Sequence, residues 1–68
     1  MTKKITWQGE PAETDAATVA AFLEERKIDA AGAVVEWNGE MFAPGDDLAA
    51  VPLADGGSLS VFKVVAGG

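Results

Sequence analysis

Residues 33–42 read Ala-Val-Val-Glu-Trp-Asn-Gly-Glu-Met-Phe, and this stretch decides the fold. The alternation of side chains places Val35 and Trp37 on one side of a strand. The Asn-Gly pair at 38–39 favours a type I′ turn, because both central positions of that turn need positive φ and this dipeptide tolerates it. Residues 40–42 are therefore predicted to return antiparallel.

Upstream of this hairpin the pattern changes to that of an amphipathic helix. Three apolar residues recur at i, i+3 and i+4 spacing, which is typical of a buried helix face. They are Val19, Phe22 and Leu23. Either Asp15 or Thr18 can accept hydrogen bonds from the first free amides of this helix.

The N-terminal residues predict a second pair of strands. Ile5 and Trp7 lie two apart, so a half-buried strand is expected over residues 3–8. Residues 9–11 read Gly-Glu-Pro and supply turn chemistry, and a short return strand is expected over residues 12–14.

The C-terminal third predicts one short helical turn and a last strand. Asp46 or Asp47 is expected to cap a turn over residues 48–51, and residues 55–58 form another turn. The last strand is predicted over residues 59–65.

Alternation divides that last strand into two faces. Leu59 and Val61 are predicted beneath the helix, because a single helix covers only one face of a sheet. Phe62 and Val64 then face solvent and are the candidate partner-binding residues. The same parity puts Lys63 on the helix side, where its side chain must reach water at the end of the sheet.

These elements predict an α+β domain over residues 1–63, followed by a flexible tail over residues 64–68. The sheet is mixed and has four to five strands, with one main helix packed on one face and a short second helix. The tail reads Val-Val-Ala-Gly-Gly and spans about 17 Å when extended. Glycine has no Cβ, so Gly67 and Gly68 can thread a narrow slot. The alternative is a frayed chain end.

Composition narrows the class of protein. The 68 residues are 49% hydrophobic and 24% charged, which favours a compact globule over a disordered chain. A net charge of -6 disfavours nucleic acid and anionic membranes as partners and favours basic protein surfaces. The chain has no cysteine, and we find neither a signal peptide nor a long apolar run, so we expect a cytoplasmic protein.

The residue types also argue against catalysis by this chain. Histidine and cysteine are both absent, which excludes the common nucleophile–base pairs and the usual zinc ligand sets. The acidic residues at 46, 47 and 55 miss the calcium-loop spacing and suit turns. Two glutamate pairs, at 10 and 13 and at 24 and 25, are expected on solvated faces. We therefore expect no intrinsic catalytic residue, no metal site and no cofactor.

The order and spacing of four segments resemble a known family across nearly the whole chain. They are Thr18-Val19 with Phe22-Leu23, Val-Glu-Trp-Asn-Gly-Glu at 35–40, Asp-Gly-Gly-Ser-Leu at 55–59, and Phe-Lys-Val-Val-Ala-Gly-Gly at 62–68. Together they resemble the ThiS-type sulfur carrier of thiamin biosynthesis, a small β-grasp, ubiquitin-like protein.

The resemblance implies a function for the tail. A ThiF-type adenylating enzyme would adenylate the carboxylate of Gly68, and a persulfide sulfur donor would convert the adenylate to a thiocarboxylate. Thiazole synthase would receive the sulfur. Gly67 would be the neighbour that fits the slot, and Ala66 would belong to the tail. The chain would be a free-standing carrier, and therefore a monomer, that serves as a protein co-substrate rather than an enzyme.

Three alternatives remain open. The small subunit of molybdopterin synthase also ends in Gly-Gly and bears a thiocarboxylate, but it is usually longer. A ubiquitin-like modifier would use the same tail to form an amide bond with a lysine. A plain interaction domain would not depend on Gly68 at all.

Overall fold

The computed structural model describes residues 2–30 and 32–63, which contain five strands and two short helices. They are β1 (Lys3–Trp7), β2 (Glu10–Thr14), α1 (Val19–Glu25), β3 (Ala33–Trp37), β4 (Glu40–Phe42), the 3-10 helix η1 (Leu48–Ala50) and β5 (Ser58–Lys63). The predicted tail, and with it the last two residues predicted for the final strand, lies outside the described residues. The division into domain and tail therefore stays a prediction.

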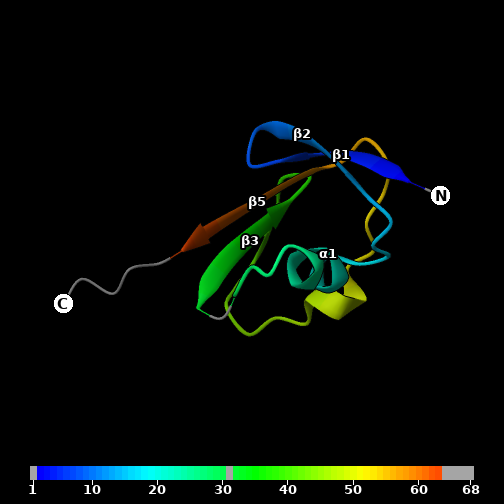
Figure 1. Cartoon of the computed structure of the whole chain (residues 1–68). Coiled ribbons are helices and arrows are strands. Elements are labelled where there is room, and N and C mark those ends of the chain that lie inside the picture. The colour runs from blue at the N-terminus through cyan, green and yellow to red at the C-terminus, as the bar shows by residue number, and fades with distance from the viewer. Residues whose placement is uncertain (1, 31, 64–68) are drawn as a thin grey trace.

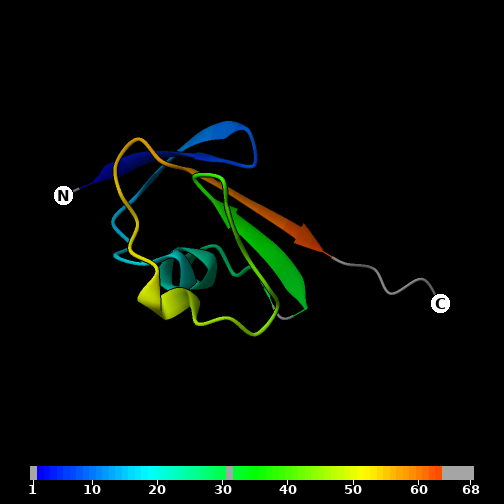
Figure 2. The same ribbon diagram turned by 180° about the vertical axis from the view of Figure 1, so that it is seen from behind.

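The strands form one mixed sheet in the order β2-β1-β5-β3-β4. β1 pairs antiparallel with β2, and β3 pairs antiparallel with both β4 and β5. β1 and β5 run parallel, so no tight turn can join the two halves of the sheet. The chain crosses between them through α1, which lies with η1 on one side of the sheet (Figures 1 and 2). This is the expected α+β, β-grasp arrangement.

The core lies between α1 and the sheet. Val19, Phe22 and Leu23 are all buried, as their spacing predicts. The rings of Phe22 and of Trp7 on β1 pack in an edge-to-face arrangement, with 5.2 Å between ring centroids and an interplanar angle of 69°. Leu59 on β5 is also fully buried. Burial of a side chain of this size contributes about 1.5–3 kcal/mol, so these few contacts supply much of the stability of a small domain.

Both ends of α1 are closed by local hydrogen bonds. The Thr18 hydroxyl accepts a hydrogen bond from the Ala21 amide at 3.1 Å, so Thr18 and not Asp15 is the N-cap. At the other end Lys27 has a φ of 57°, and the amide of Ile28 donates to the Leu23 carbonyl at 2.8 Å. This is a Schellman ending with lysine in the position that glycine usually takes.

The second hairpin turns as predicted, but the first does not. Asn38 and Gly39 have φ angles of 52° and 85°, which are type I′ values. In the first hairpin the turn lies at Gln8 and Gly9, with φ angles of 51° and 82°, and β2 already begins at Glu10. The predicted turn over residues 9–11 is therefore wrong. The proline at position 11 is tolerated because β2 is an edge strand of the sheet.

Gly57 allows Trp37 to close one end of the core. Gly57 is buried, and a Cβ built there would overlap the Trp37 ring. We expect Gly57→Ala to lower the free energy of unfolding by about 1–3 kcal/mol, because a well-packed site must shift to admit a methyl group. Chemical denaturation of the two proteins measures this difference.

The control is the same change in a Trp37→Leu background. With the ring removed, the second substitution should cost much less, as a double-mutant cycle would show. An equal loss in both backgrounds would mean that backbone conformation, and not contact with Trp37, requires glycine.

Candidate functional site

The candidate site is the C-terminal end of β5. On one side β5 pairs with β3 along its length, up to the register pair of Lys63 with Ala33. On the other side β1 pairs only with Ser58 and Leu59, the first two residues of β5. The second half of β5 therefore extends beyond β1, and Figure 2 shows it projecting at the end of the sheet.

The two faces of β5 are divided as the alternation predicts. Leu59 and Val61 are buried on the helix side. The Phe62 side chain lies on the opposite face and is 50% exposed, so its predicted exposure is confirmed. Lys63 follows the parity of the buried residues, but its position at the end of the strand leaves it exposed. β5 thus places one large apolar side chain in solvent next to the residues of the tail.

Phe62 has apolar neighbours on the same face of the sheet. Val34 on β3 is its register partner and is half-buried. Met41 on β4 is 58% exposed and faces outward, because it pairs with Glu36, the next outward residue of β3. We name Phe62, Val34 and Met41 the outer apolar patch. It spans three adjacent strands, with Met41 one register row from the Val34–Phe62 pair, and exposed apolar side chains on one face of a sheet are candidates for binding another protein.

Val34 and Met41 were missed from the sequence. The signal for them was the two-residue turn at 38–39, because the length of a hairpin loop fixes which residues pair across it. With Trp37 facing the core, that register sends Met41 outward.

Four of the predicted site residues lie outside the described residues. They are Val64, Ala66, Gly67 and Gly68. Their predicted roles in partner binding, slot fitting and modification stay predictions.

The aspartates at positions 46, 47 and 55 have structural roles, as expected. Asp46 accepts a hydrogen bond from the Ala43 amide at 2.8 Å, and Asp47 caps η1. Asp55 accepts one from the Lys4 amide at 2.7 Å and so ties the loop before β5 to β1. Across residues 2–30 and 32–63 we find no group of three or more acidic side chains placed to hold a metal ion.

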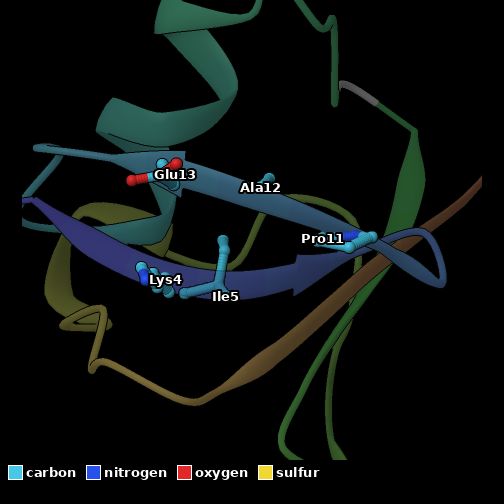
Figure 3. Close-up of a pocket in the computed structure, with 5 residues that line it drawn as sticks. All are labelled: Lys4, Ile5, Pro11, Ala12 and Glu13. Carbon is cyan, nitrogen blue, oxygen red and sulfur yellow. The ribbon is translucent and has the colours of Figure 1, made fainter.

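A hollow of about 310 Å³ lies on the first hairpin (Figure 3). Its lining residues come from β1 and β2 and are Lys4, Ile5, Pro11, Ala12 and Glu13. Lys4 and Glu13 are exposed cross-strand partners. Since β1 meets only the start of β5, this hollow is separate from the candidate site. Within the described part of the chain, no helix is long and apolar enough to cross a membrane.

Comparison with known proteins identifies the family. The model of the ThiS family matches residues 3–68, nearly the whole chain. The chain belongs to the ThiS family. The resemblance seen in the sequence is therefore confirmed.

A solved structure supports the same assignment for this ThiS-family chain. The crystal structure of the thiamine biosynthesis protein (ThiS) from Geobacter metallireducens has 28% sequence identity and a TM-score of 0.77. The alignment covers 96% of this chain and 99% of that chain. The predicted β-grasp fold is thus confirmed over the full length of a related protein. A search among curated proteins found no match.

Proposed function

We propose that this chain is a sulfur carrier of thiamin biosynthesis, in which the carboxylate of Gly68 is adenylated and then converted to a thiocarboxylate. The observation that carries the proposal is the family match, which runs through the two terminal glycines. The related crystal structure is of a thiamine biosynthesis protein and supports the same pathway. The chain acts as a co-substrate of other enzymes and not as a catalyst.

The proposed chemistry needs a partner at each step. A carboxylate oxygen of Gly68 attacks the α-phosphate of ATP in a ThiF-type enzyme, which forms the acyl adenylate and releases pyrophosphate. The terminal sulfur of a persulfide donor then displaces AMP, and a thiol cleaves the sulfur–sulfur bond to leave the thiocarboxylate. Thiazole synthase accepts that sulfur. The activating enzyme supplies the electrostatic stabilisation of these steps, and the carrier supplies reach and recognition.

The exposed end of β5 supports this division of labour. The outer apolar patch offers a docking surface beside the residues that lead to Gly68, while the net charge of -6 favours a partner with a basic surface. Apolar contact contributes affinity at the centre of such an interface, and charge increases the rate of encounter.

The proposal predicts a defined mass change. After incubation with a ThiF-type enzyme, ATP and a persulfide donor, the intact protein should gain the mass that corresponds to replacement of one oxygen by one sulfur. Fragmentation should place the sulfur on Gly68. A variant lacking Gly68 is the control and should keep its mass. An unchanged mass with a demonstrably active enzyme would contradict the carrier role, and an amide link to a lysine would identify a modifier instead.

The narrow-slot argument predicts the behaviour of Gly67→Ala. A methyl group next to the reacting residue should block its entry into the partner's active site, so we expect at least a tenfold loss of adenylation rate, by the scale of a misplaced reacting group. Pyrophosphate release measures that rate. Val65→Ala is the matched control, since it changes the tail outside the glycine pair. Normal thiocarboxylate formation by Gly67→Ala would contradict the slot argument.

The outer apolar patch predicts a binding defect without a folding defect. Phe62→Asp should weaken binding to the activating enzyme by about 2 kcal/mol, since it removes an exposed aromatic contact, while the free energy of unfolding changes by less than about 1 kcal/mol. Titration calorimetry and thermal unfolding measure the two quantities. Thr6→Asp places the same charge on the same face at β1 and should bind normally. A large drop in melting temperature for Phe62→Asp would place its ring in the core.

A further inference from the structure

The second half of β5 has an edge that β1 does not cover. The last contact between main-chain groups there is the hydrogen bond from the Gln8 amide to the Leu59 carbonyl, at 3.0 Å. Along a strand, the N–H and C=O groups of one residue point to the same edge, and successive residues alternate between the two edges. The N–H and C=O groups of Val61 and Lys63 therefore point to the same edge of β5 as the Leu59 carbonyl. They lie beyond the end of β1.

At Val61 the side chain of Gln8 makes the hydrogen bonds that a neighbouring strand would otherwise make. Its Oε1 atom accepts a hydrogen bond from the Val61 amide at 3.0 Å, and its Nε2 atom donates to the Val61 carbonyl at 3.1 Å. A side-chain carboxamide carries a C=O acceptor and an N–H donor side by side, as a peptide group does. Gln8 thus extends the β1–β5 ladder by one step through its side chain.

The backbone of Gln8 makes this arrangement more specific. Gln8 is the first central residue of a type I′ turn and has a φ of 51°, which is uncommon for a residue with a Cβ. Asn38 has the same place in the other hairpin, and its Oδ1 atom accepts from the Ser58 amide at 2.8 Å. Asparagine suits this turn position better than glutamine does. Its side chain is one methylene shorter, however, and at position 8 it falls short of Val61.

We propose that Gln8 is a positioning residue for sulfur-carrier activation. Its carboxamide holds Val61 from the side that β1 leaves open, while β3 pairs with the flanking residues Ser60 and Phe62 on the other side. Val61 precedes Phe62 directly and lies two residues before Lys63, the last described residue. Gln8 therefore fixes the main chain of β5 directly before Phe62 and Lys63, at the end of the strand that leads to the tail in the sequence. This inference rests on the proposed function.

The effect on kinetics follows from the cost of ordering a strand end. Without the two hydrogen bonds, the end of β5 is freer before binding and must be ordered when the activating enzyme binds. Ordering one residue reduces an association constant by roughly tenfold, so the KM for the carrier should rise by about that factor. Once the complex has formed, Gly68 is held by the partner, so kcat should stay the same.

Two substitutions separate the side-chain hydrogen bonds from the turn. Gln8→Asn removes both bonds but improves the turn, which offsets part of the lost stability, so its melting temperature should exceed that of a variant that keeps an unfavourable turn residue. Gln8→Met keeps the length of the side chain and the unfavourable turn residue but cannot donate or accept in the same way. Both variants should lose protection of the Val61 amide by at least tenfold in hydrogen exchange followed by NMR. The Phe62 amide, which faces β3, is the internal control and should keep its protection.

The deciding measurement is the KM for the carrier in ATP–pyrophosphate exchange catalysed by a ThiF-type enzyme. A rise of about tenfold in both variants, with kcat unchanged, supports the positioning role. If KM instead follows melting temperature, so that Gln8→Asn is clearly less impaired than Gln8→Met, Gln8 acts only through stability and the proposal is overturned. Unchanged Val61 protection in both variants overturns it as well. If the unmodified carrier is never adenylated, the proposed function fails. The role of Gln8 in activation then fails with it, whatever the hydrogen-exchange measurements on Val61 show.

Discussion

The placement of β5 at the centre of the sheet is the constraint on which the rest of the structure depends. β5 is parallel to β1 and antiparallel to β3, so the two hairpins cannot be joined by a turn and the chain must cross a face of the sheet. That crossing contains α1, whose apolar face covers Leu59 on β5. One strand therefore joins the two hairpins, carries part of the core and leads to the C-terminal residues.

A domain of this size has to use the same strand for stability and for recognition. The alternation of β5 buries Leu59 and Val61 on the helix side and exposes Phe62 on the other. The uncovered face of the sheet then gathers apolar side chains from three strands, although they are far apart in the sequence.

Hydrogen bonds from turn side chains supplement the sheet where strands are too short. Asn38 holds the first residue of β5, Gln8 holds its middle, and Asp55 ties the preceding loop to β1. Each bond adds only about 1 kcal/mol, but together they define where β5 begins and how it is held at Val61. The position of β5 is thus determined by polar contacts as well as by the apolar core.

The sequence by itself determined those features that depend on near neighbours. The turn at Asn38, the buried face of α1 and the exposure of Phe62 all follow from dihedral preference and periodicity within a few residues. The tertiary structure alone decided the order of the strands, the pairing of Val34 with Phe62 across β3 and β5, the position of the first turn and the contact of Gln8 with Val61. Gln8 and Val61 are 53 residues apart. Contacts over such a separation depend on how the hairpins dock against each other, which no local pattern records.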